Sequence, residues 1–167
     1  MSVSFEFLPK DRTAEYMPGL FDILHSNMSV IAPTGNSYEE DFRIWSAAVG
    51  EGLKRDARQI ILIRDGGTII GFFQYYINDS VFMMEEIQFR REYQGKGVFR
   101  RLYGFLRGVV PETVESVEAY ARKENAKSQA ILGHLGLKII GEGSGGRTYH
   151  YRGDCQAMLN RYGGESK

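Results

Sequence analysis

A short segment in the middle of the chain combines glycines and cations in a way that favours anion binding. Gly95 and Gly97 stand between a β-rich run and a helical pattern. Glycine lets a backbone turn tightly and approach a ligand closely. The first turn of a helix leaves N–H groups without partners, at the positive end of the helix dipole. Lys96, Arg100 and Arg101 add positive charge nearby. The segment therefore predicts a pyrophosphate site at the start of a helix.

A plainer interpretation of the same residues stays open, namely an ordinary strand-to-helix turn with solvated basic side chains. Two other phosphate motifs do not apply. The Gly-Lys pair lacks the Ser or Thr and the four-residue spacer of a Walker loop. The Gly-x-Gly run is not followed by the third glycine of a dinucleotide fingerprint.

The elements that would position this segment follow from periodicity and turn signals. The expected strands are 3–8, 59–64, 68–77, 81–90, 114–121, 137–141 and 147–152. The expected helices are 13–27, 97–108, 125–134 and 153–162. A further helix is expected to begin after a cap at Ser37. This order predicts an α+β fold with a mixed, mostly antiparallel sheet flanked by helices. We expect one domain over 1–162 and a disordered tail at 163–167. Tyr38, Phe42 and Trp45 are expected in the core.

The glycine segment resembles the acetyl-CoA motif of the GNAT superfamily of acyl-CoA N-acyltransferases. That motif reads Arg/Gln-x-x-Gly-x-Gly/Ala between a strand and an amphipathic helix, and here it is Gln94-x-x-Gly97-x-Phe99. The stretch 125–137 is similar to the asparagine-initiated helix of the same family, which ends in Leu-Gly-Phe. Both blocks occur in the family's order and separation. The resemblance covers about 64–152 and implies the GNAT fold.

The resemblance also implies how acetyl-CoA binds, as a cosubstrate and with no metal. It implies that the strands 81–90 and 114–121 splay apart and hold the cofactor between them. The pantetheine arm would pair with backbone groups of Ile87, Gln88 and Phe89, and Asn125 would position its end. The pyrophosphate would bind the backbone amides of the glycine segment, which are those of Gln94, Gly95, Lys96, Gly97, Val98, Phe99 and Arg100.

Two residues depart from the family pattern. Phe99 stands where Gly or Ala is usual, so its side chain must point away from the phosphates. Leu132 stands where the family commonly has a tyrosine that protonates the departing thiolate. A thiol has a pKa of about 8.5. The loss of this acid would therefore slow the transfer without stopping it. Either another group or water donates the proton, or the chain does not catalyse.

Acetylation of an amine requires a base, because an amine with a pKa of about 10 is mostly protonated at pH 7. Glu85 and Glu86 lie beside the implied thioester site and alternate onto opposite strand faces. Glu85 shares its face with apolar residues, where a carboxylate is unexpected unless it is paired or used. Its position also resembles the base of some polyamine-acetylating relatives. We expect Glu85 as the base and Glu86 as the second candidate. The alternative is a buried salt bridge or an exposed edge charge.

Other acid–base candidates have structural interpretations that are favoured. Tyr120, Tyr149 and Tyr151 are spare proton donors on expected strands, but each is more typical of a packed sheet aromatic. His134 follows Leu132 by two residues, which is about 200° around a helix. We expect His134 on the surface.

Composition excludes several other classes of function. The 167 residues carry a formal net charge of zero, so no global field attracts nucleic acid or an anionic membrane. Cys155 is the one cysteine, which precludes an internal disulfide and fits a reducing compartment. No apolar run approaches the roughly 20 residues that span a bilayer. We expect a cytoplasmic protein.

The leading functional prediction is transfer of acetyl from acetyl-CoA to a primary amine of a small molecule or peptide. The alternatives are a non-catalytic acyl-CoA-binding module, which Leu132 favours, and a protein-interaction domain. A homodimer is a candidate assembly, and by resemblance the late strand 147–152 would form its contact.

Overall fold

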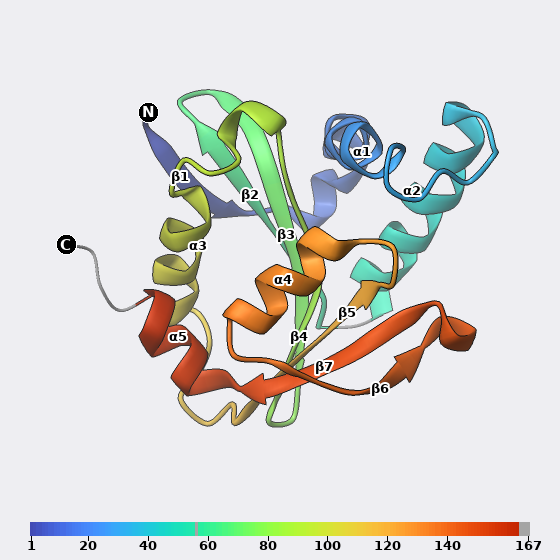
Figure 1. The fold of residues 1–167 in the computed structure, drawn as a ribbon. Helices are drawn as coiled ribbons and strands as arrows, with labels where there is room; N and C mark the ends of the chain where they lie inside the picture. Colours follow the sequence, from blue (N-terminus) through green and yellow to red (C-terminus); the bar gives the residue numbers. More distant parts are fainter. Residues whose placement is uncertain (56, 164–167) are drawn as a thin grey trace. The chain divides into compact units, whose positions relative to one another are not determined.

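The computed structural model describes residues 1–55 and 57–163 (Figure 1). Each strand and helix expected from the sequence is present, with ends that differ by a few residues. The strands are β1 Val3–Phe7, β2 Gln59–Asp65, β3 Thr68–Asn78, β4 Val81–Phe89, β5 Ser116–Arg122, β6 Lys138–Gly143 and β7 Thr148–Asp154. The helices are α1 Thr13–Met28, α2 Tyr38–Arg55, α3 Val98–Arg107, α4 Ala126–His134 and α5 Cys155–Gly163.

The strands form one sheet with the order β1-β2-β3-β4-β5-β7-β6. The pairs β1–β2, β2–β3, β5–β7 and β6–β7 are antiparallel. The pair β4–β5 is parallel, because the chain returns from β4 through α3 before it enters β5. This confirms the predicted α+β fold with a mixed, mostly antiparallel sheet.

The chain divides into two compact units. The first comprises Met1–Tyr75 and Glu86–Gln94, and the second comprises Tyr76–Glu85 and Gly95–Lys167. The predicted single domain over 1–162 stays a prediction. Gly163, where the disordered tail was expected to begin, is instead the last residue of α5. The rest of that tail, 164–167, lies outside the described residues.

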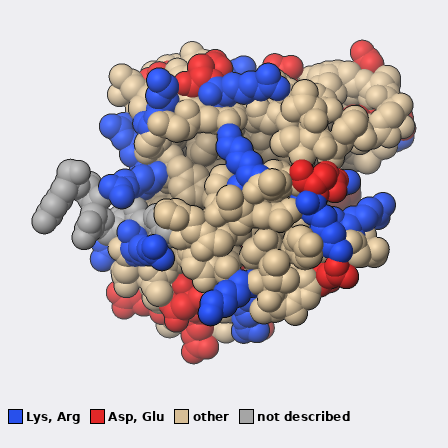
Figure 2. Space-filling model, in the orientation of Figure 1, with Lys and Arg blue, Asp and Glu red and all other residues tan. Residues whose placement is uncertain are grey.

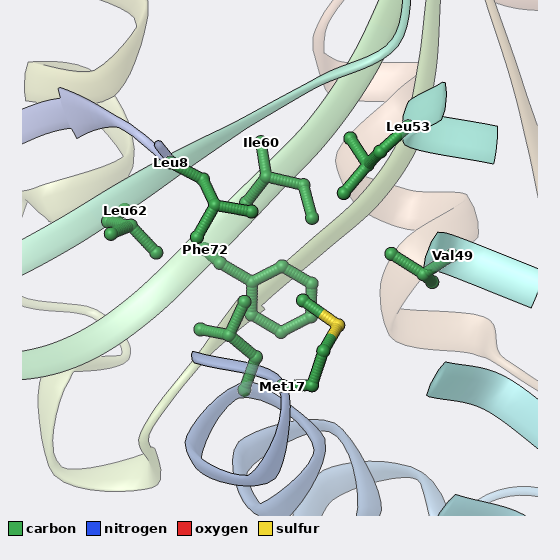
Figure 3. Packing of buried hydrophobic residues seen from close by; sticks show 8 residues of the cluster. Leu8, Met17, Val49, Leu53, Ile60, Leu62 and Phe72 are labelled. Atoms are coloured by element: carbon green, nitrogen blue, oxygen red, sulfur yellow. The ribbon is translucent and has the colours of Figure 1, made fainter. Parts of the chain in front are cut away.

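The core of the first unit joins α1 and α2 to β2 and β3. Ser37 Oγ accepts a hydrogen bond from Glu40 N at 3.1 Å, which confirms the predicted helix cap. Phe42 and Trp45 are partly buried and pack against the core, as predicted, whereas Tyr38 is 38% exposed. The buried members of the cluster are Leu8, Met17, Leu20, Val49, Leu53, Ile60, Leu62 and Phe72 (Figure 3).

In the second unit, one face of β4 and β5 is packed. On this face Phe82, Val117 and Ala119 are nearly inaccessible. Helix α3 buries Leu102 and Tyr103 on a single stripe and packs against α5. The Tyr103 hydroxyl donates to Met84 Sδ at 3.2 Å, and burial raises the pKa of this tyrosine well above its usual value. The opposite face, called the polar face below, carries Glu118 and Tyr120 on β5 and Glu85 beside Val81 and Met83 on β4.

Strand β7 is paired on both sides, with β5 from Ser116↔Asp154 to Arg122↔Thr148 and with β6 along its other edge. Both rows of its backbone hydrogen-bonding groups are therefore used. A contact between 147–152 and a second copy of the chain stays a prediction. The terminal strand on that side of the sheet is β6, where Ile139 and Ile140 are each 53% exposed.

None of the helices in the described residues combines the length and the apolarity needed to cross a membrane.

Candidate active site

The glycine segment forms a tight turn directly before α3. Gly95 has φ of 75° and Gly97 has φ of 81°, both in the left-handed region that other residues rarely adopt. No atom lies within 4 Å of a Cβ added to either residue. The glycines are therefore needed for the backbone conformation and not for close packing. Gly95, Lys96 and Gly97 are all exposed.

The first turn of α3 has no cap from its own N-cap residue. Gly97 occupies that position and makes no side-chain hydrogen bond, and the first turn contains no acidic residue. Lys96, Arg100 and Arg101 are exposed beside it. The start of α3 is therefore uncapped by Gly97 and has exposed cations beside it, as at helix N-termini that bind phosphate.

Phe99 does not crowd this turn. Its ring lies against Tyr103 one turn later in α3, with 4.7 Å between ring centroids. A phenylalanine is therefore accommodated where the family pattern has a small residue, because its side chain follows the helix surface at the i, i+4 spacing.

In the first unit, the segment before the turn is attached to the β2–β3 hairpin. The Tyr93 hydroxyl donates to Asp65 Oδ2 at 2.7 Å, and the Ser2 amide donates to Asp65 Oδ1 at 2.7 Å. The hydrogen bond from Tyr93 is the main cause that lowers the pKa of Asp65. Tyr93 thus has a positional role that the motif alone does not disclose.

The second half of β4 presents its backbone groups alternately to two sides. Arg90 N donates to Ile70 O at 2.8 Å, so the main chain of Arg90 faces β3. The Gln88 carbonyl also faces β3, because a Cβ added to Gly71 would lie 2.4 Å from its oxygen. Backbone groups of adjacent residues point to opposite sides of a strand. The main-chain groups of Ile87 and Phe89 therefore lie on the other edge.

One of those groups is already used. The Phe89 carbonyl accepts from Asn27 Nδ2 at 2.8 Å and from Gln94 Nε2 at 3.2 Å, which occupies both of its lone pairs. Asn27 Nδ2 also lies 3.0 Å from Gln88 Oε1. Asn27 stands 62 residues before Phe89, so no local sequence signal points to it.

The two candidate carboxylates lie on opposite faces of β4, as alternation predicted. Glu86 is on the face of Phe82 and Met84 and accepts from Gln88 Nε2 at 2.8 Å. Glu85 is half-buried, as are the other residues on its face. The face of Glu85 was interpreted as an apolar face on which a carboxylate is costly. Glu86, not Glu85, shares the face of the buried Phe82 and Met84, and the assignment of Glu85 as the base stays a prediction.

The helix α4 begins and ends as its sequence predicts. Asn125 Oδ1 accepts from Ser128 N at 3.1 Å, which caps the helix. Leu132 is buried, with 9% of its surface exposed, and the helix contains no tyrosine. His134 is exposed, as predicted.

The three tyrosines named as spare donors lie on two faces of the sheet. Tyr151 is 5% exposed and sits opposite Ala119, on the packed face. Tyr149 is on that same face, with Lys123 Nζ 5.0 Å from the centre of its ring. Tyr120 lies on the polar face and is 47% exposed.

Tyr120 belongs to a cluster that the sequence did not indicate. His150 Nε2 lies 2.5 Å from Glu118 Oε1, and the His150 and Tyr120 rings are stacked with centroids 4.3 Å apart. The cluster depends on the pairing of β5 with β7, which brings together residues far apart in the chain. The sequence contained two signals for this cluster. They are the alternation of Glu118 and Tyr120 on one expected strand and His150 on a later one.

Neither the surface charge nor the arrangement of possible metal ligands among the described residues indicates a further site. Lysines, arginines and acidic residues are interspersed on the face seen in Figure 2, which shows no large surface of one sign. Among the described residues, no group of three or more His, Cys, Asp and Glu side chains is arranged to hold a metal ion. The expected absence of a metal stays a prediction.

The sequence matches the model of the acetyltransferase (GNAT) family over residues 17–137, which is well over half of its 167 residues. This chain belongs to the GNAT acetyltransferase family. The match covers α3 and α4 and confirms the resemblance inferred from Gln94, Gly97 and Asn125. No curated protein matches the chain significantly.

Solved structures of acetyltransferases share the fold of this GNAT chain. The PaiA N-acetyltransferase of Thermoplasma acidophilum, in complex with coenzyme A, is 13% identical with a TM-score of 0.72 over 92% of this chain and 99% of that one. An acetyltransferase of Thermus thermophilus is 15% identical with a TM-score of 0.71, covering 92% and 97%. Mutant forms of the spermidine/spermine N-acetyltransferase SpeG of Vibrio cholerae are 16% identical with a TM-score of 0.62, covering 96% and 98%.

Proposed function

We propose that this GNAT chain transfers an acetyl group from acetyl-CoA to a primary amine. The observation that carries the proposal is the uncapped start of α3, where Gly95 and Gly97 hold a left-handed turn beside exposed cations. In the proposal, the amides from Gln94 to Arg100 bind the diphosphate of the cofactor. A structure of a relative with coenzyme A supports this ligand class.

The pantetheine arm is proposed to use the outer edge of β4. The N–H and C=O of Ile87 and the N–H of Phe89 are the groups on that edge, since the Phe89 carbonyl already accepts two side-chain donors. Gln88 contributes through its side chain, which links Asn27 to Glu86. Asn125 is proposed to position the end of the arm while it caps α4.

Glu85 is proposed as the base that removes the first proton of the protonated amine. It is half-buried, which leaves it accessible. The amine nitrogen then attacks the thioester carbonyl. The acetylated nitrogen and the thiolate of coenzyme A are the products of the chemical step. The acceptor is proposed to be a small amine or a peptide amine, and the relative that acts on spermidine/spermine supports a cationic acceptor.

Two measurements test this function. Coenzyme A at about 100 times its Kd should stabilise the fold by about 2.7 kcal/mol, seen as a rise in Tm. Release of thiol from acetyl-CoA in the presence of an amine panel should show turnover. The absence of any stabilisation at near-millimolar coenzyme A would refute the site itself.

The Glu85→Gln variant tests the base. Proton transfer by a positioned side chain contributes about 100-fold to 10,000-fold. We expect kcat to fall within that range while the Kd of coenzyme A is unchanged. Glu86→Gln should have a smaller effect, because a glutamine can still accept from Gln88 Nε2. Equal activity of Glu85→Gln and the unsubstituted protein would remove Glu85 as the base.

A non-catalytic acyl-CoA-binding module is the second candidate function. The buried Leu132 favours it, because α4 supplies no phenolic acid for the thiolate. Stabilisation by coenzyme A without turnover on any amine would decide in its favour.

A further inference from the structure

The polar face of the second unit carries a carboxylate–histidine pair that has no role in the function proposed above. Glu118 and Tyr120 alternate with the buried Val117 and Ala119 on β5 and therefore share the polar face. Directly paired residues lie on the same face of a sheet. Because Tyr120 pairs with His150, the histidine joins them on this face of β7.

The pair is close and mostly buried. The 2.5 Å contact joins His150 Nε2 to Glu118 Oε1, and the two side chains are 21% and 15% exposed. An ionised carboxylate only accepts hydrogen bonds, so Nε2 carries the shared hydrogen. His150 Nδ1 makes no hydrogen bond to any of the described residues. Nδ1 is therefore the nitrogen open to a ligand while Glu118 holds the ring through Nε2.

Tyr120 fixes the other side of the imidazole. Its ring is stacked on His150 with an interplanar angle of 14°. The same ring reaches over Gly143 of β6, where an added Cβ would lie 2.7 Å from Tyr120 Cε1. The tyrosine thus leans over β7 toward β6.

The pair lies near the point where β4 and β5 stop pairing. Their ladder ends at Met84↔Ala119, although β5 continues to Arg122. The next residue on each strand is Glu85 on β4 and Tyr120 on β5. Met83 pairs with Glu118, so Glu85 is on the same polar face. The proposed base and the histidine pair therefore flank the end of one ladder, on one face.

We propose that His150, oriented by Glu118 and Tyr120, carries the proton from the acetylated nitrogen to the departing sulfur. The inference rests on the proposed acetyl transfer. The amine nitrogen bonds to the thioester carbon, and the carbonyl electron pair moves to oxygen. The proton on that nitrogen passes to His150 Nδ1. The C–S bond then breaks with its electrons on sulfur, and the Nδ1 proton moves to sulfur, which gives the free thiol and neutral imidazole.

This assignment accounts for the leucine at position 132. A single imidazole that first accepts and then donates the same proton replaces a separate phenolic acid. Glu118 keeps the ring in one orientation through both steps, because Nε2–H donates to it in the neutral and in the charged state. His150 is a catalytic residue in this scheme, and Glu118 and Tyr120 are positioning residues.

The test compares His150→Gln with His134→Gln, a substitution of the exposed histidine of α4. For His150→Gln we expect kcat to fall on the order of 100-fold or more, with the Kd of coenzyme A and the Tm unchanged. His134→Gln should keep full activity. Glu118→Gln retains an acceptor for Nε2–H and should lower kcat less than His150→Gln.

A second pair of variants tests whether the orientation of the His150 ring matters, and it leaves His150 and Glu118 unchanged. Gly143→Ala must displace the Tyr120 ring and should lower kcat, whereas Gly141→Ala adds a methyl group with no atom within 4 Å and should not. Normal kcat in His150→Gln would overturn this inference and leave the acetyl transfer intact. A parallel loss of kcat and Tm in that variant would also overturn it, in favour of a structural role. An unsubstituted protein that acetylates no amine would overturn both proposals.

Discussion

The helices α3, α4 and α5 of the second unit differ in whether the side chain of the N-cap residue accepts a hydrogen bond from the first turn. Asn125 Oδ1 accepts from Ser128 N at the start of α4, and Asp154 Oδ1 accepts from Ala157 N at the start of α5. Helix α3 begins instead at Gly97, which has no side chain to cap it. Two helix starts have a side-chain cap from the N-cap residue, and the third has none. The difference supports the proposal that the start of α3 binds a ligand, whereas the two capped ends serve stability.

A charge reversal at α3 should have the largest effect. Arg100→Glu places a carboxylate in the first turn, where it favours the helix dipole but opposes a bound diphosphate. We expect the affinity for coenzyme A to fall by about 2 kcal/mol, or roughly 30-fold, in isothermal titration calorimetry, with no loss in Tm. Lys127→Glu in the first turn of α4 is the control and should leave affinity unchanged. A comparable loss in both variants would break the contrast between the helices.

Glycine-to-alanine substitutions should change stability in opposite directions at the two helices. Gly97→Ala forces alanine into φ of 81° and should cost about 1–2 kcal/mol. Gly133→Ala, inside α4 with no atom within 4 Å, should gain roughly 0.5–1 kcal/mol. Each kcal/mol changes Tm by about 2–4 °C in a chain of this length, so calorimetry resolves both changes in Tm. A stabilised Gly97→Ala variant would show that the left-handed turn is not required.

Removal of the α4 cap should cost stability that an alternative cap restores. Asn125→Ala loses the acceptor for Ser128 N and should cost about 1 kcal/mol. Asn125→Asp keeps that acceptor and should retain most of the Tm. Both variants lose the amide donor of Asn125, so a fall in affinity for acetyl-CoA in both would support the proposed contact with the pantetheine arm.

The smallest effect on stability is expected at the hydrogen bond between Tyr93 and Asp65, which precedes the glycine turn. The hydrogen bond from Tyr93 lowers the pKa of Asp65 in the folded state, so its contribution to stability is present above the unfolded value of about 3.9. That contribution is lost as pH falls through the lower folded value. We expect Asp65→Asn to lower Tm near neutral pH, and the difference from the unsubstituted protein to shrink toward about pH 3. A difference independent of pH would contradict this linkage.

Local features of the fold were predictable because their causes are local. The turn at Gly95 and Gly97, the cap at Asn125 and the alternation of Glu85 and Glu86 each depend on a few consecutive residues. Alternation could separate the two faces of β4, but it could not tell which of them is packed. That choice depends on tertiary packing, which buries Phe82 completely, and the role of Glu85 stays a prediction.

The sequence by itself determined the order of the elements, the family and the uncapped start of α3, because periodicity, glycine conformation and capping act over a few residues. The tertiary structure decided which distant groups meet. Asn27 reaches the Phe89 carbonyl across 62 residues, and His150 reaches Glu118 across 32. Such contacts follow from strand register and helix packing, which depend on the whole core and leave no signal in either segment alone.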